Sequence, residues 1–166
     1  MSTGHKLSLP LFAEISVGDP TTPQTRPTIE RARQRLGGRG YSLAGIGRIV
    51  LVDSPRVGKL VGVLIFASET EHDVLLESGV VRRTSRGSSL PYGGEVPDLL
   101  SRFAADVQVF ATLREQDALC FEFAPGKTAT GTLIEKCRYG ALVGTAEGRV
   151  LAVGFRKLWP RASGCC

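Results

Sequence analysis

The sequence predicts a mainly β domain in the form of a small antiparallel barrel. The chain has 166 residues, of which 42% are hydrophobic and 22% are charged, as in one ordinary globular domain. From Tyr41 onward, about eight short apolar runs follow one another at regular spacing, separated by glycine-rich or acidic turns. Such a pattern is typical of small barrels and sandwiches, and it disfavours an α/β fold.

Residues 1–40 are predicted to form an extended arm and a short basic helix. In the arm, Leu7, Leu9 and Leu11 alternate with Lys6, Ser8 and Pro10, so that the arm could lie as an edge strand on a partner. The helix is predicted over residues 27–36, because proline stands at its start, no breaker lies inside it and two glycines follow it. A helix this short is marginal alone and must dock on other parts of the chain.

The barrel domain is predicted over residues 41–161, followed by a frayed tail at 162–166. Its strands are expected at residues 49–52, 60–66, 73–76, 107–113, 119–123, 130–137, 139–144 and 149–155. The run at 107–113 shows the apolar–polar alternation of a half-buried strand. Residues 82–97 are too polar and too rich in glycine, serine and proline for regular structure, and residues 98–105 are expected to add one or two helical turns behind this long loop.

The strands also contain a faint internal repeat. In this alignment Gly47–Val50 matches Gly131–Ile134, and Gly62–Phe66 matches the run at 139–143. Each pair is followed by a strand after an acidic turn, at residues 71–76 in the first copy and 147–151 in the second. The sequence leaves open whether the two copies close into one barrel or into two separate units.

Residues 47–81 resemble a cold-shock domain, which is a five-stranded barrel of the OB type. Members of that family begin with a Gly-x-Ile/Val strand, continue through a Gly-Phe-Ile strand and then have an Asp-Val-Phe-Val-His strand. The counterparts here are Gly47–Val52, Gly62–Phe66 and Asp73–Glu77, and Asp117–Phe123 matches a later family strand. The resemblance implies an OB or cold-shock barrel that binds single-stranded nucleic acid.

Cold-shock domains stack bases on exposed aromatic residues of their second and third strands, worth roughly 1–3 kcal/mol per base. In this chain the third-strand positions are Leu75, Leu76 and Glu77, which cannot stack. Only Phe66 and Tyr139 are left as candidate stacking surfaces.

The charge of the chain agrees with an anionic partner. The formal net charge is +5, and 16 of the 21 basic residues are arginine, whose planar fork of donors suits phosphate. The alternative explanation is a genome rich in G and C, whose codons favour arginine. We take as candidate phosphate contacts Arg82, Arg83, Arg86, Lys136 and Arg138.

The sequence offers no catalytic or metal-binding motif. Neither His5 nor His72 stands in a recognisable Ser-His-Asp or GxSxG pattern, and the segment Asp53–Lys59 lacks the first glycine and the final Ser or Thr of a phosphate loop. The four cysteines contain no CxxC pair, so we expect no metal site and no cofactor. They are expected as free thiols, although a disulfide between Cys120 and Cys137 is an alternative.

The end of the chain at Cys165 and Cys166 is similar to prenylated double-cysteine tails, but no GTPase domain accompanies it. The longest apolar run has eight residues, against roughly 20 needed to span a bilayer, and the N-terminus does not resemble a signal peptide. A cytoplasmic location without a membrane span is therefore predicted.

Together these observations predict a non-catalytic module that binds RNA or single-stranded nucleic acid, alone or as a subunit of a ribonucleoprotein. The alternative is a scaffolding subunit that docks on a protein partner through its barrel edge and N-terminal arm. A small-molecule substrate is not expected.

Overall fold

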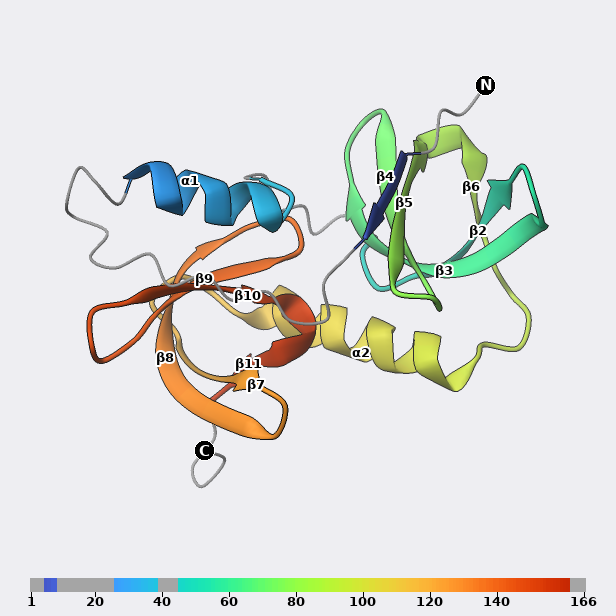
Figure 1. Ribbon diagram of the computed structural model, residues 1–166. Coiled ribbons are helices and arrows are strands. Elements are labelled where there is room, and N and C mark those ends of the chain that lie inside the picture. Colours follow the sequence, from blue (N-terminus) through green and yellow to red (C-terminus); the bar gives the residue numbers. More distant parts are fainter. Residues whose placement is uncertain (1–4, 9–25, 39–44, 162–166) are drawn as a thin grey trace. The chain divides into compact units, whose positions relative to one another are not determined.

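The computed structural model describes residues 5–8, 26–38 and 45–161 (Figure 1). The chain divides into two compact units. Unit 1 contains the described residues 5–8 and 45–108, and unit 2 contains residues 26–38 and 109–161. Each unit is built around one antiparallel sheet. No helix in the described part of the chain combines the length and hydrophobicity needed to cross a membrane.

Unit 1 holds a six-stranded sheet in the order β1-β5-β4-β3-β2-β6. Its elements are β1 (His5–Ser8), β2 (Ile49–Ser54), β3 (Gly58–Ala67), β4 (Glu71–Leu76), β5 (Val80–Ser85), the 3-10 turn η2 (Arg86–Ser88) and β6 (Ser89–Pro91). Strands β2 to β5 form a meander, and the short β6 returns to pair with β2. The N-terminal strand β1 pairs with β5 of the same chain.

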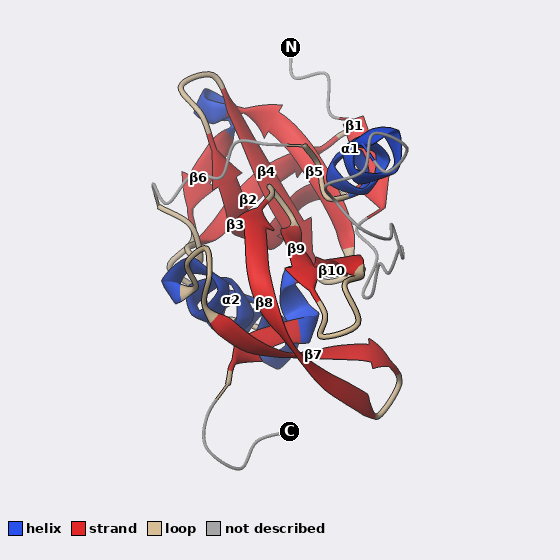
Figure 2. Cartoon of the chain, turned by 90° about the vertical axis from the view of Figure 1, so that its left-hand side faces the viewer, coloured by secondary structure: helices blue, strands red, loops and turns tan. Residues whose placement is uncertain are grey.

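Unit 2 holds a five-stranded sheet in the order β10-β9-β8-β7-β11. Its elements are β7 (Ala118–Ala124), β8 (Lys127–Lys136), β9 (Gly140–Gly144), β10 (Val150–Gly154), the 3-10 turn η3 (Phe155–Lys157) and β11 (Leu158–Pro160). Helix α1 (Arg26–Arg35) belongs to unit 2, and helix α2 (Asp98–Thr112) begins in unit 1 and ends in unit 2. Figure 2 distinguishes these helices from the strands by colour.

The two sheets repeat the same strand pairing at a constant displacement of 69 residues, from Val50 to Leu119. Val50 pairs with Pro91 in unit 1, and Leu119 pairs with Pro160 in unit 2. The bulge in the second strand follows Leu64 in β3 and Leu133 in β8. Strands β2 to β6, the bulge in the second strand and the 3-10 turn of unit 1 all have counterparts at this displacement in unit 2, whereas β1 has none among the described residues and β7–β8 has an additional bulge after Glu122. Apart from these two differences, the two units share one arrangement of strands.

A glycine at the same place in each second strand allows the third strand to come close. A Cβ on Gly131 would lie 2.6 Å from Val143 Cγ1 and 2.8 Å from the Gly144 carbonyl oxygen, and a Cβ on Gly62 would likewise collide with Val74. No side chain fits at these positions without moving its neighbours. The matching glycines are therefore a packing requirement of both copies.

Each unit has an apolar core of its own. In unit 1 the core cluster consists of Val50, Val52, Leu64, Val74 and Leu76. In unit 2 the apolar face of α1 packs on the sheet, in a cluster made of Ile29, Ala32, Leu36, Cys137, Leu142, Val150 and Ala152. The buried stripe at a spacing of three and four residues is what anchors this short helix.

The prediction of a mainly β chain with one or two helices is confirmed, and α1 lies within one residue of its predicted bounds, but α2 continues beyond the predicted residues 98–105. A single OB-type barrel is not confirmed, since the strands form two separate sheets. The strand predicted at residues 107–113 is wrong, because that segment lies in α2 up to Thr112. Leu100, Phe103, Val107 and Phe110 are buried at helical spacing, while Val109 of the apparent alternation is 37% exposed.

Two further predictions are corrected. Residues 82–97, expected as one long loop, contain the end of β5, the turn η2 and strand β6, and only residues 92–97 lack regular structure. The internal repeat exists, but its predicted alignment was displaced by one strand, since it matched β3 with β9 instead of β8. Short apolar runs with glycine at their start occur in several strands, so the pattern alone did not determine the register.

Candidate functional site

The predicted contact residues are divided between the two units. Arg82, Arg83 and Arg86 lie on β5 and η2 and Phe66 on β3, all in unit 1, whereas Lys136, Arg138 and Tyr139 lie in unit 2. They do not form one site within either unit. Phe66 and Tyr139 are 7% and 4% exposed, so neither ring offers a stacking surface to a base. Arg82 is also buried.

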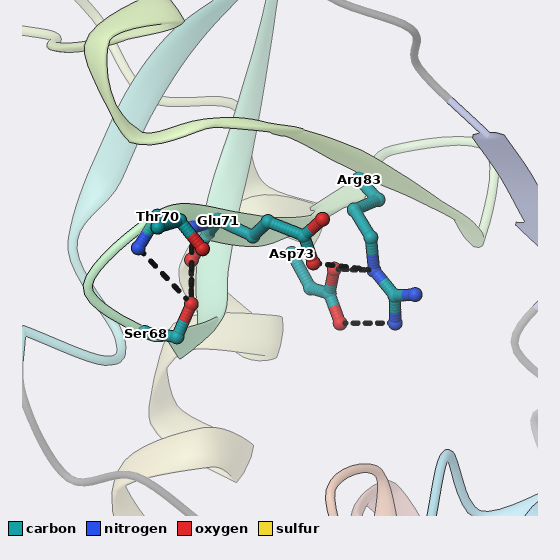
Figure 3. Close-up of polar contacts among 5 residues, drawn as sticks. All are labelled: Ser68, Thr70, Glu71, Asp73 and Arg83. Atoms are coloured by element: carbon teal, nitrogen blue, oxygen red, sulfur yellow. Dashed lines mark hydrogen bonds and ion pairs between the residues drawn. The ribbon is translucent and has the colours of Figure 1, made fainter.

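Arg83 is held in an ion pair inside the sheet. It lies directly opposite Asp73 on the neighbouring strand β4, and its guanidinium donates to both carboxylate oxygens at 2.9 and 3.3 Å (Figure 3). The carboxylate of Glu71 approaches the same guanidinium at 3.7 Å. Because the Asp73 side chain is completely buried, this arginine is needed to balance a buried charge.

Lys136 caps the end of helix α2 in unit 2. Its ammonium donates to the carbonyl oxygens of Phe110 and Leu113, both at 2.7 Å, and lies 4.7 Å from the centre of the Phe110 ring. Burial lowers the pKa of Lys136 to about 8, and the nearby Asp117 opposes this shift. A cation at the last carbonyls of a helix is electrostatically favourable. This lysine thus stabilises unit 2 from within.

Arg138 and Tyr139 hold the C-terminal end of α1. Their backbone N–H groups donate to the carbonyl oxygens of Gly38 and Leu36, at 3.1 and 2.8 Å. A Cβ on Gly37 would lie 2.6 Å from Tyr139 Cε2, and Gly37 has a φ of +81°. Close contact with the ring and the left-handed backbone both require glycine here. The two residues have a structural role in unit 2.

Arg86 differs from the other predicted residues, because it is exposed and lines a cavity of about 480 Å³ in unit 1. Three segments surround this cavity, namely the approach to β2, the β3–β4 turn with the start of β4, and the start of η2. The lining residues are Gly45, Arg48, Ala67, Ser68, Glu69, His72 and Arg86. We call this feature the Arg48–Arg86 cavity.

The Arg48–Arg86 cavity has a positive lining. Within the described residues neither Arg48 nor Arg86 forms an ion pair, and the guanidinium of Arg48 donates to the Gly45 carbonyl oxygen at 3.1 Å. Glu69 is the one acidic residue among the described lining residues. Two arginines against one carboxylate leave an unbalanced positive charge.

His72 is the buried polar residue of this cavity. It is 8% exposed, and its Nδ1 atom has no hydrogen-bond partner among the described residues. Its pKa is lowered mainly by burial and then by the positive charges of Arg86 and Arg48, which outweigh the opposing effect of Asp73. The imidazole is therefore neutral near pH 7 and has a ring nitrogen to share with a ligand.

Hydrogen bonds order the β3–β4 turn beside the cavity. The hydroxyl oxygen of Ser68 accepts from the backbone N–H groups of Thr70 and Glu71, at 3.3 and 3.0 Å (Figure 3). The N–H of Arg86 donates to the Thr70 carbonyl oxygen at 3.0 Å, which ties η2 to the same turn. The segments that carry the charged groups are thus preorganised, which lowers the entropic cost of binding.

The side chains that line this cavity are of a kind that can bind an anion. Guanidinium groups and an imidazole can donate hydrogen bonds to phosphate or carboxylate oxygens. No group of three or more His, Cys, Asp or Glu side chains that could hold a metal ion occurs in the part of the chain that the structure describes. Cys137 is a buried free thiol as expected, so the alternative of a disulfide between Cys120 and Cys137 is wrong, and the expectation of a free thiol is wrong for Cys120, which is disulfide-bonded.

Of the residues that line the cavity, Arg86 is a predicted contact residue, whereas Arg48 and His72 are not. Arg48 precedes β2 by one residue, and His72 lies on β4 and belongs to no recognisable motif. Arg48 and His72 are 24 residues apart in the chain and line the same cavity only because the meander folds. A local spacing in the sequence therefore could not reveal that they lie together. Comparison with models of known protein families and with curated proteins finds no match to this chain.

Proposed function

We propose that the chain is a non-catalytic module that binds RNA or another single-stranded nucleic acid through the Arg48–Arg86 cavity of unit 1. The observation that carries the proposal is the convergence of two arginines, without an ion pair among the described residues, on a preformed cavity. Phosphate contacts from arginine supply most of the sequence-independent affinity of nucleic-acid binding. The net charge of +5 would add long-range attraction for the same ligand.

Stacking on aromatic residues has no part in this proposal, since Phe66 and Tyr139 are buried. The chain would contact phosphates and leave the bases largely unread. A cytoplasmic location and a place in a ribonucleoprotein agree with such binding and stay predictions.

We further propose that each unit is a small barrel. In each, a meander of four strands is followed by a 3-10 turn and a short strand that returns to the first. The predicted resemblance to a cold-shock domain covers β2 to β4 in unit 1, a simple meander that many small β folds share, and assigns the later family strand to residues 117–123, which lie in unit 2.

The alternative function, docking on a protein through the N-terminal arm, has less support. Strand β1 already pairs with β5 of its own chain, over the four residue pairs from His5–Arg83 to Ser8–Val80. That pairing uses the edge of β5 which a partner strand would need.

Polarisation binding of a labelled single-stranded RNA pool at 50 mM salt tests the proposal. The wild type should bind with micromolar or tighter affinity, and Arg48→Gln with Arg86→Gln should weaken binding about tenfold or more, as expected for the loss of charge-assisted bonds. The matched control, Arg56→Gln with Arg102→Gln, removes two exposed arginines of unit 1 that do not line the cavity. No binding by the wild type would refute the proposal and favour a protein partner.

A further inference from the structure

The internal repeat identifies the residues of unit 2 that correspond to those of the Arg48–Arg86 cavity in unit 1. With the displacement of 69 residues, Arg48 corresponds to Asp117 in unit 2 and Arg86 to Phe155. Ala67 corresponds to Lys136. The Phe155 ring lies 6.2 Å from that of Phe110 at the end of α2.

At the corresponding place in unit 2, side chains of the unit itself contact one another and the backbone. A cation, Lys136, lies there and donates to the last carbonyls of α2. The side chain of Asp117 accepts from the backbone N–H of Arg114 at 2.8 Å. Both charged groups have partners within unit 2, and two phenylalanine rings occupy space next to them.

In unit 1 the corresponding place is the Arg48–Arg86 cavity, where Arg48 donates to the Gly45 carbonyl oxygen and neither arginine forms an ion pair among the described residues. Two arginines replace the acid and the phenylalanine, and the small side chain of Ala67 replaces the lysine. His72, which replaces a buried alanine of β9, contributes an Nδ1 atom without a hydrogen-bond partner in the described residues. Arg48, Arg86 and His72 thus add groups that can bind an anion, whereas Ala67 and Glu69 stand in place of the cations Lys136 and Arg138, so the difference from unit 2 lies in donors that face an open space.

The ligand should be compact and doubly charged. A phosphomonoester carries close to two negative charges at neutral pH and three acceptor oxygens, whereas a backbone phosphodiester carries one charge. Two guanidinium groups from different segments can each donate to such a group, and the neutral imidazole can donate to the third oxygen. Both arginines and His72 line a single cavity, so the arrangement suits one terminal group better than a row of phosphates.

We propose that the Arg48–Arg86 cavity is a site for a phosphomonoester, held by the guanidinium groups of Arg48 and Arg86 and by the His72 imidazole. The inference rests on the proposed function in so far as the monoester belongs to the end of a nucleic-acid strand. A free mononucleotide presents the same chemistry, and the test distinguishes these two sources.

The test compares ligands that differ only in the terminal phosphate. Labelled ten-nucleotide RNAs with a 5′-phosphate, with a 3′-phosphate or with hydroxyls at both ends are titrated by polarisation, and adenosine 5′-monophosphate is titrated by the NMR signals of the His72 ring. One phosphorylated end should bind at least about tenfold tighter than the hydroxyl end. Arg48→Gln and Arg86→Gln should each abolish that preference, while Arg56→Gln should keep it.

The outcomes separate this inference from the proposed function. Tighter binding of one phosphorylated RNA supports recognition of a strand end. A shift of the His72 signals by the mononucleotide, with no binding of any RNA, supports the phosphomonoester site and refutes the nucleic-acid module. Equal binding of all three RNAs with no effect of the mononucleotide refutes the site and leaves the proposed function standing. A preference that Arg56→Gln removes as fully as Arg86→Gln would also overturn the assignment of the cavity.

Discussion

Lys136 gives the sharpest prediction about the stability of unit 2. Its pKa is lowered from 10.5 to about 8 by burial. Between these two values the unfolded chain binds a proton that the folded chain does not, so the free energy of unfolding rises with pH through this window. At 1.36 kcal/mol per unit, the full shift corresponds to about 3 kcal/mol. Because Lys136 is only partly buried, we expect about 1–2 kcal/mol.

The perturbation is Lys136→Met, which keeps the length of the side chain and removes its charge. The variant should be less stable than the wild type at pH 7 by about 1–3 kcal/mol, because carbonyl oxygens of Phe110 and Leu113 lose their donor. The difference in unfolding free energy between wild type and variant should then grow by about 1–2 kcal/mol between pH 7.5 and 9.5.

Urea unfolding followed by tryptophan fluorescence measures this difference directly. Trp159 is the only tryptophan of the chain and lies on β11, so the signal reports on unit 2. Other groups that titrate at alkaline pH affect both proteins equally and cancel in the difference. Parallel pH profiles of the wild type and Lys136→Met would refute the reasoning.

Three further predictions concern unit 1. Gly62→Ala should destabilise it by about 1–3 kcal/mol in urea unfolding, because the new methyl group collides with Val74 and lies 2.9 Å from the Leu75 carbonyl oxygen. Asp73→Ala should cost about 1–3 kcal/mol in the same assay, since it removes the bidentate partner of Arg83, which keeps some exposure to solvent and the carboxylate of Glu71 nearby. Because the pKa of His72 is lowered in the folded state, unit 1 should become less stable as the pH falls below about 6.5, the pKa of histidine in the unfolded chain. His72→Gln should lack this pH dependence when the stability of unit 1 is followed by amide-resolved NMR.

The elements that the sequence predicts well are those whose patterns are local. Helix α1 has a proline near its start, glycines after it and apolar residues at helical spacing, and each of these signals depends only on neighbouring residues. The first strands, β2 and β3, contain β-branched runs separated by a proline-containing turn. Their bounds in the structure extend the predicted ones without moving them.

Helix α2 shows where the same reasoning fails. Val107, Val109 and the residues after them satisfy the alternation of a strand, yet Leu100, Phe103 and Phe110 also satisfy the helical period. The two periods can be distinguished only over the whole segment, and dividing it at residue 105 concealed the longer pattern. Tertiary burial of Phe103, Val107 and Phe110 supports the helix.

The candidate site could not be predicted because it depends on long-range pairing. Five of the seven predicted contact residues carry charge, and charge alone does not distinguish Arg83, which balances Asp73, from Arg86, which lines a cavity. That distinction comes from the register of β4 and β5, which places Arg83 opposite a buried acid. Likewise, the difference between the Arg48–Arg86 cavity and the corresponding place in unit 2 is visible only when β3 is aligned with β8.

The salt dependence of RNA binding tests most directly whether the Arg48–Arg86 cavity contacts phosphate. Each phosphate contact with a single strand contributes about −0.7 to the slope of log affinity against log salt. Removing both arginines by Arg48→Gln and Arg86→Gln should therefore make the slope less steep by about 1.4, and Arg56→Gln with Arg102→Gln should leave it closer to that of the wild type. A wild-type slope that the cavity variant leaves unchanged would contradict the account.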